Sequence, residues 1–218
     1  MNIAIDGPAG AGKSTIAKRV SKKLGYVYVD TGAMYRTMAL YFLRNQIDGS
    51  DEKAVSDSLD AVSVEIRYVD GEQKVLLNGE DVTSLIRTEE VGNMASATSK
   101  YPAVRAKLLE LQRDLARKMD VVMDGRDIGT TILPDAEVKI YLTASVEARG
   151  KRRFEELQAK GVACDFEQIK KDIEDRDYRD MHREVSPLKQ AEDAYYLDSS
   201  DMNIEEVTEA IINRINER

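Results

Sequence analysis

The chain has 218 residues, a formal net charge of −8 at pH 7 and one cysteine. This length fits one core domain with insertions, and the acidic balance argues against sequence-blind binding to a nucleic-acid backbone. Cys164 has no partner for an internal disulfide, no run approaches the ~20 apolar residues of a membrane span, and the N-terminus lacks a secretory pattern. We therefore expect a cytoplasmic protein with no nucleic-acid and no membrane partner.

Residues 2–6 form a short apolar run that stops at glycines, which predicts a buried strand. After a glycine-rich loop at 7–13, apolar residues recur at helical spacing as far as Leu24, and Gly25 suits the C-terminal cap of this helix. Residues 26–30 predict a second strand. We expect the next helix to have Thr31 as its N-cap.

The pattern changes near Ala61, where apolar and polar residues begin to alternate. Asp70-Gly71 and Asn78-Gly79 are strong hairpin signals on either side of an apolar stretch. The sequence therefore predicts a small antiparallel sheet inserted between helices. It also predicts one helical segment over 87–119.

The second half alternates strands with helices. Residues 121–124, 138–142 and 194–198 predict strands, and 145–160, 166–182 and 204–215 predict helices. Such alternation is typical of an α/β protein with a mostly parallel sheet covered on both faces.

Residues 7–14, Gly-Pro-Ala-Gly-Ala-Gly-Lys-Ser, match the phosphate-binding P-loop pattern G-x-x-x-x-G-K-[ST]. Glycines let backbone N–H groups approach an anion closely, and the following helix adds the positive end of its dipole. Lys13 would reach the β- and γ-phosphates of a nucleoside triphosphate, and the Ser14 hydroxyl would bind Mg²⁺. An accidental glycine-rich turn is disfavoured, because the match lies between a predicted strand and a predicted helix.

Six arginines fall in the two charged helices: Arg149, Arg152, Arg153, Arg176, Arg179 and Arg183. A small-molecule kinase must itself neutralise the phosphoryl group in flight, and arginines closing over the phosphates would do so and exclude water. A solvated helix face with Arg–Glu pairs explains the same pattern. The residues alone leave both interpretations open.

Charged residues also follow two predicted strands. Asp30 and Asp124 lie at strand ends, and Arg126 and Asp127 come directly after Asp124. Ligands of α/β sheets bind outside the carboxyl ends of the strands. An aspartate there can hold a magnesium-bound water, and an arginine can fork onto a phosphate.

Four segments together resemble the bacterial cytidylate kinases of the nucleoside monophosphate kinase family: 3–14, 30–36, 124–130, and 176–180 followed by Arg183. The resemblance spans essentially the whole chain. It implies an α/β fold with a P-loop NTPase core, a five-stranded parallel sheet, an inserted acceptor-binding lobe with a small antiparallel β piece, and a short helical lid. The implied ranges are 1–30, 116–148 and 185–218 for the core, about 31–115 for the insert, about 149–165 for the lid, and 166–184 for an acceptor-binding helix. It also implies a monomer.

The resemblance assigns roles residue by residue. For catalysis it implies Lys13, Arg126, Arg149 and Arg153; for ATP, Gly7, Pro8, Ala9, Gly10, Ala11, Gly12, Lys13, Ser14 and Thr15. For CMP it implies Thr31, Tyr35, Arg36, Ser96, Arg105, Arg126, Asp127, Arg176, Asp180 and Arg183. For Mg²⁺ it implies Ser14 directly, with Asp30 and Asp124 through water. Family members often carry serine where this chain has Thr31, which keeps the hydroxyl.

The expected reaction is in-line transfer of the γ-phosphoryl group of ATP to CMP or dCMP. Alternatives are a P-loop kinase with another acceptor, such as UMP, AMP or shikimate, and an ATPase or switch driven by hydrolysis. A phosphate monoester is largely dianionic near neutral pH, with a second pKa of about 6, so no strong general base is needed. His182, the one histidine, is expected to lie on the surface.

Overall fold

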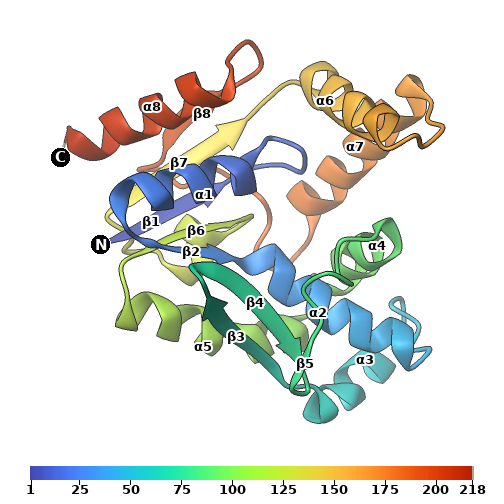
Figure 1. Cartoon of the computed structure of the whole chain (residues 1–218). Helices are drawn as coiled ribbons and strands as arrows, with labels where there is room; N and C mark the ends of the chain where they lie inside the picture. The colour runs from blue at the N-terminus through green and yellow to red at the C-terminus, as the bar shows by residue number, and fades with distance from the viewer. Residues whose placement is uncertain (218) are drawn as a thin grey trace. The chain divides into compact units, whose positions relative to one another are not determined.

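The computed structural model describes residues 1–217 and divides the chain into two compact units. The first unit comprises Met1–Tyr26 and Val122–Arg218, and the second comprises Val27–Val121. The elements of Figure 1 are β1 (Asn2–Asp6), α1 (Lys13–Leu24), β2 (Val27–Asp30), α2 (Thr31–Arg44), α3 (Glu52–Ser58), β3 (Val64–Val69), β4 (Glu72–Leu77), β5 (Glu80–Asp81), α4 (Glu89–Thr98), α5 (Pro102–Lys118), β6 (Val121–Gly125), β7 (Val138–Thr143), α6 (Val146–Ala159), α7 (Phe166–His182), β8 (Tyr195–Asp198) and α8 (Ile204–Asn216). Two short helical turns, η1 (Leu59–Ala61) and η2 (Ile128–Ile132), complete the order.

The main sheet has five strands in the order β2-β6-β1-β7-β8. β1 pairs in parallel with β7, with Ile3 opposite Val138, and β7 pairs in parallel with β8. Ile3, Ile5, Ile140 and Leu142 are almost fully buried, as expected for strands covered on both faces. This arrangement confirms the predicted α/β class with a five-stranded parallel sheet.

The sheet reverses its direction of growth between the neighbouring strands β1 and β6. From β1 the chain proceeds to β2 on one side, and from β6 it proceeds to β7 on the other. The carboxyl ends of two such strands form the switch point where α/β proteins bind ligands. The P-loop follows β1, and Arg126 and Asp127 follow β6.

The predicted antiparallel insert is present in the second unit as a sheet in the order β3-β4-β5 (Figure 1). Asp70 and Gly71 have φ of 53° and 78°, and Asn78 and Gly79 have φ of 49° and 87°. Positive φ at both central residues is what two-residue hairpin turns require, and Asn-Gly and Asp-Gly supply it at little cost. Both predicted hairpins are therefore confirmed, and β5 adds a short third strand.

The hairpin is joined to β2 by side chains. The amide of Gln73 accepts from Asp30 N at 2.9 Å and donates to Asp30 O at 3.2 Å, so one side chain pairs both backbone groups of a strand residue. Tyr68 donates its hydroxyl to Tyr28 O at 3.1 Å. β2 is the first strand in the sheet order, so these bonds lie along an edge of the sheet.

Three sequence predictions differ from the structure. Asp30, not Thr31, caps α2, since its carboxylate accepts from Ala33 N at 2.9 Å while Thr31 is already helical. The segment 87–119 is not one helix. It is broken between Thr98 and Pro102, because Pro102 disfavours a helical residue before it and starts α5 at its first turn. Helix α3, capped by Asp51, was not predicted.

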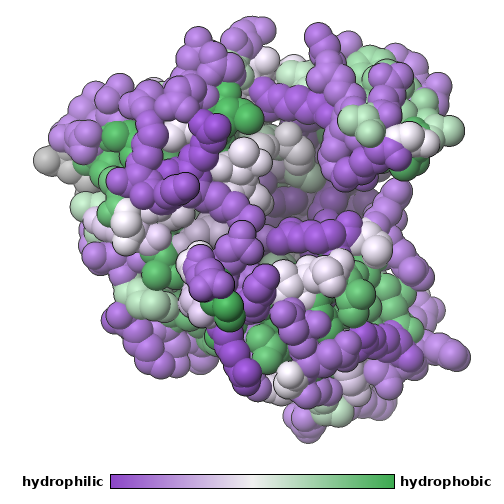
Figure 2. All heavy atoms as spheres, in the orientation of Figure 1, coloured by the Kyte–Doolittle hydropathy of each residue, from purple (hydrophilic) through white to green (hydrophobic). Residues whose placement is uncertain are grey.

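Two observations concern the surface. In the described residues no helix is long and apolar enough to cross a membrane. On the face drawn in Figure 2 hydrophilic residues predominate, and the apolar ones form small scattered groups.

Candidate active site

The P-loop lies between β1 and α1, as the motif predicts. Gly10 and Gly12 have φ of 77° and 86°, which only glycine adopts without strain. Gly12 is the N-cap of α1 and has no side chain to occupy the first N–H groups of the helix. These groups, with the positive end of the helix dipole, suit a phosphate anion.

Gly7 is required by close packing. A Cβ on Gly7 would lie 1.9 Å from the carbonyl oxygen of Leu142 on β7. The loop therefore begins where backbone meets backbone, and no larger residue fits.

Lys13 is buried within the loop, with 6% of its surface exposed, and its ammonium donates to Pro8 O at 2.7 Å. Burial, together with the nearby Arg126, holds the pKa of Lys13 well below its ordinary value, against the attraction of Asp124, Asp6 and Asp180. The lysine is thus held inside the phosphate loop among two basic and three acidic groups.

Ser14 and Asp124 meet as the magnesium prediction requires. The Ser14 hydroxyl donates to Asp124 Oδ2 at 2.9 Å, and Asp124 is buried near the end of β6. A hydroxyl and a carboxylate are oxygen ligands, and Mg²⁺ commonly uses one or two such groups with substrate phosphates and water. The described residues contain no cluster of three His, Cys, Asp or Glu side chains, which also fits an ion held largely by substrate.

Asp6, at the end of β1, is a buried acid that sequence reasoning did not assign to the site. Its Oδ1 accepts from Ile128 N and its Oδ2 from Gly129 N, both at 2.7 Å. Burial raises the pKa of Asp6 to about 6, although the two backbone bonds oppose the shift. The signal in the sequence was an acid at the end of an otherwise apolar strand.

Arg126 and Asp180 form an ion pair, with Nε and Oδ2 2.9 Å apart. Burial alone would raise the pKa of Asp180, but Arg126, Arg176 and Arg183 outweigh it and lower that pKa. Arg183 also lies 3.4 Å from Asp127 and donates to Ser186 O at 2.7 Å. The first unit therefore brings five predicted CMP-binding residues into one charged cluster.

The arginines of α6 divide between the two interpretations left open by the sequence. Arg149 is 4% exposed, and its guanidinium contacts both oxygens of Asp177 on α7, at 3.0 and 2.5 Å. It also donates to Ala9 O of the P-loop at 3.0 Å. Arg153 is exposed and pairs with Glu156 three residues on, as a solvated helix face predicts. Arg149 thus reaches the phosphate loop, while Arg153 and the exposed His182 lie on the surface.

In the second unit, α2 carries the predicted residues that follow β2. Thr31 is buried in its first turn. Asp30 pairs with Arg87 at 2.6 Å in addition to capping the helix, so its carboxylate is already engaged by protein groups. The Arg36 guanidinium donates to Ile86 O and Thr88 O at 3.1 and 3.2 Å.

Arg36 rests on a glycine of α4. A Cβ on Gly92 would lie 2.9 Å from one terminal nitrogen of Arg36 and 3.0 Å from the other. The bare helix surface at Gly92 therefore gives the guanidinium its place.

The remaining predicted residues of the second unit lie on neighbouring elements. The Arg105 guanidinium is 5.5 Å from the Tyr35 ring centroid and donates to Ser99 O at 3.2 Å. The hydroxyl of Ser96 on α4 is buried, with no hydrogen-bond partner among the described residues. A buried hydroxyl of this kind suits a polar ligand group.

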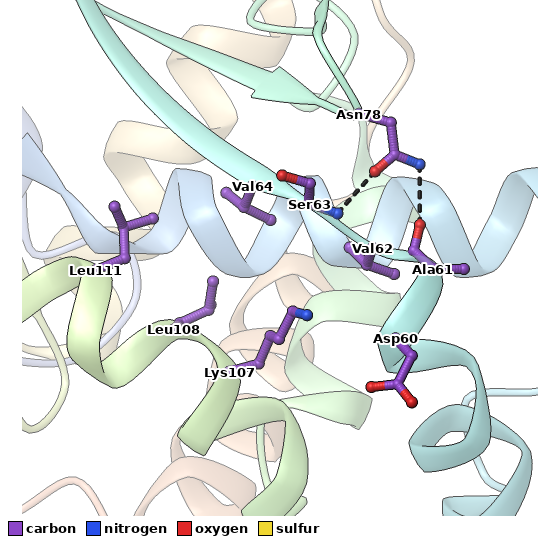
Figure 3. Close-up of a pocket in the computed structure, with 9 residues that line it drawn as sticks. All are labelled: Asp60, Ala61, Val62, Ser63, Val64, Asn78, Lys107, Leu108 and Leu111. Atoms are coloured by element: carbon purple, nitrogen blue, oxygen red, sulfur yellow. Dashed lines mark hydrogen bonds between the residues drawn. The ribbon is translucent and has the colours of Figure 1, made fainter.

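The second unit also has a pocket of about 310 Å³ between the start of β3 and α5 (Figure 3). Its lining residues are Asp60, Ala61, Val62, Ser63, Val64, Asn78, Lys107, Leu108 and Leu111. The Asn78 amide accepts from Ser63 N and donates to Ala61 O, which fixes one side of the pocket. None of the predicted site residues lines it, so it is separate from the candidate active site.

Comparison with known proteins gives a family and a fold. A family model described as cytidylate kinase matches residues 3–217. A cytidylate kinase of Lactobacillus gasseri is 54% identical over 97% of this chain and 92% of its own length. One of Caldicellulosiruptor saccharolyticus is 52% identical over 97% and 94%, respectively.

Among solved structures, the similarity lies in the fold alone. A shikimate kinase from Bacteroides thetaiotaomicron aligns over 99% of this chain and 98% of its own, with a TM-score of 0.51 and 13% identity. An uncharacterized protein from Eubacterium ventriosum aligns over 100% and 99%, with a TM-score of 0.54 and 13% identity. The first of these is a kinase, in agreement with the phosphate loop described above.

Proposed function

Since this chain belongs to the cytidylate kinase family, we propose that it transfers the γ-phosphoryl group of ATP to CMP or dCMP, giving ADP and CDP or dCDP. The observation that carries the proposal is the P-loop with buried Lys13 beside the charged cluster that follows β6. One group grips a triphosphate and the other suits a second phosphate.

ATP binds through the loop residues Gly7 to Thr15. Lys13 and Arg126 stabilise the charge on the transferring group, and Arg149 and Arg153 of α6 contribute from the lid. Preorganised positive groups in a water-poor site are worth more than in bulk water. The structural support is that Lys13 and Arg149 are both buried at the loop and both bond to its carbonyls.

Ser14 would hold Mg²⁺ directly, and Asp124 would hold it through water. The bound ion would neutralise phosphate charge and orient the triphosphate. Asp30 is the weaker candidate for this role, because its two oxygens cap α2 and pair with Arg87.

CMP binds through residues of each unit. In the first unit, Arg126 and Arg183 bind the acceptor phosphate, Arg176 and Asp180 bind the sugar, and Asp127 faces the base. In the second unit, Tyr35 and Arg36 bind the phosphate, and Thr31, Ser96 and Arg105 face the base. The insert, the lid and the acceptor-binding helix take the ranges expected from the sequence, and the enzyme acts as a monomer.

The base contacts explain the choice of acceptor. Cytosine presents a donor at N4 and acceptors at N3 and O2, so Asp127 accepts from N4 and Arg105 donates to the ring. Uracil would bring an oxygen against the Asp127 carboxylate, at a cost of roughly 1–3 kcal/mol. CMP should therefore be preferred to UMP by at least about tenfold.

An acceptor panel tests the proposal. Protein, ATP and Mg²⁺ are incubated with CMP, dCMP, UMP, AMP or shikimate, and ADP release is followed. ADP release only with the cytidine nucleotides is expected. Steady release without an acceptor would favour an ATPase, and no CDP from ATP and CMP would refute the function.

A further inference from the structure

We infer that Asp6 is a positioning residue for the acceptor base, because its carboxylate fixes the turn that carries Asp127 to the strand that precedes the phosphate loop. The inference rests on the proposed function for the role of Asp127. The contacts of Asp6 themselves belong to the first unit.

The turn needs an external partner. In η2 the carbonyl of Asp127 accepts from Thr131 N and Ile132 N, so the helical turn starts at Asp127. The first N–H groups of such a turn have no partner within it. No side chain of the turn itself caps them.

Asp6 supplies that partner from another strand. Its two oxygens accept from Ile128 N and Gly129 N at 2.7 Å each, which is short for N–H···O and typical of an ionised acceptor. Asp6 is 5% exposed, so the contact is shielded from water. The carboxylate thus acts as an N-cap donated by β1 to a turn more than 120 residues later in the chain.

The residues fixed in this way are the ones proposed to recognise the acceptor. Asp127 immediately precedes Ile128, and Arg126 precedes Asp127. Asp127 is itself buried, and Arg183 is 3.4 Å away. A displacement of the turn would therefore move the Asp127 carboxylate relative to the base, while the loop glycines that bind ATP keep their conformation.

The approach of turn to strand also depends on Gly129. A Cβ there would lie 3.1 Å from Lys139 Cδ and 3.4 Å from Asp6 Oδ2. Glycine permits the close contact, and a larger residue would push the turn away from Asp6.

Asp6→Asn is the main test. Asparagine keeps the shape but offers one acceptor oxygen, so one N–H would face an NH₂ group. We expect the KM for CMP to rise at least tenfold, the KM for ATP to stay within threefold, and the preference for CMP over UMP to fall at least fivefold. Amide exchange at Ile128 and Gly129 should also accelerate.

Asn203→Ala is the control variant. It removes the capping box of α8, in which Asn203 accepts from Glu206 N and Glu206 accepts from Asn203 N. We expect a lower Tm with both KM values unchanged. A purely structural role for Asp6 would give the same profile as this control.

Two results would overturn the inference: parallel changes in the KM for ATP and CMP, or a normal KM for CMP in folded Asp6→Asn. If that variant does not fold, Gly129→Ala decides, because it moves the turn and leaves Asp6 in place. A threefold or greater rise in the KM for CMP alone supports the inference, and an unchanged value refutes it. If the wild type makes no CDP, the proposed function fails, and amide exchange at the turn still judges Asp6.

Discussion

Replacement of Lys13 by methionine should separate activity from stability. Lys13 is buried and its pKa is lowered, so the folded protein stabilises its positive charge poorly. Methionine fills a similar volume without a charge. The loss is one charged hydrogen bond to Pro8 O, worth about 1.5–3 kcal/mol, and the gain is release of the cost of burying the ammonium.

These opposing terms are of similar size, so the free energy of unfolding should change by no more than about 1.5 kcal/mol. For a chain of this length that corresponds to a Tm shift of roughly 3–6 °C. Activity should fall far more. Loss of one preorganised group facing developing charge costs on the order of 10²–10³ in kcat.

Steady-state CDP formation and thermal unfolding, measured on the same preparations, test this expectation. Lys139→Met is the matched control, because the Lys139 side chain is only 9% exposed and pairs with Asp193. Its kcat should stay within about threefold of wild type. A Lys13→Met variant with kcat within fivefold of wild type would refute the assignment of Lys13 to the triphosphate.

Three further variants probe other contacts. Gly92→Ala should raise the KM for CMP roughly 5–30-fold, equivalent to about 1–2 kcal/mol, because the new Cβ displaces Arg36; helix propensity favours alanine, so calorimetry should show no loss of stability, and an unchanged KM would exclude Arg36 from the acceptor site. Gly7→Ala should destabilise by about 3 kcal/mol or more, since its Cβ would meet Leu142 O at 1.9 Å, whereas Gly25→Ala, also at positive φ but with no atom within 4 Å, should cost about 1–2 kcal/mol; equal denaturation midpoints would contradict the packing argument. The pKa of Asp6 is raised from 3.8 to about 6, so the folded state holds this proton more tightly than the unfolded state, and the wild type should lose up to about 3 kcal/mol relative to Asp6→Asn as the pH rises from 4 to 7. Urea titrations at several pH values measure this difference, and a constant difference would show that Asp6 is not perturbed.

The local elements of the fold were predictable because their signals lie within a few residues. The P-loop, the Asp-Gly and Asn-Gly turns and helix α7 all lie where the sequence places them. The strand order was not predictable, since it depends on contacts between segments far apart in the chain. The break before Pro102 was available in the sequence, but the apolar periodicity on both sides concealed it.

The candidate site was predictable in membership but not in its contacts. Ser14 and Asp124 are 110 residues apart, and only the fold brings them to 2.9 Å. The burial of Arg149 against Asp177 had no local signal, because an arginine on a charged helix is usually solvated. Asp6 was missed for the same reason, since its partners are backbone groups of a distant turn.

The Gln73 side chain has a consequence for the evolution and engineering of this chain. A strand at the border of a sheet presents unpaired N–H and C=O groups that can recruit another molecule and start aggregation. Gln73 covers both groups of Asp30, so the hairpin that carries it acts as a molecular guard. A version of the enzyme shortened by deleting this hairpin should lose solubility before it loses the phosphate loop.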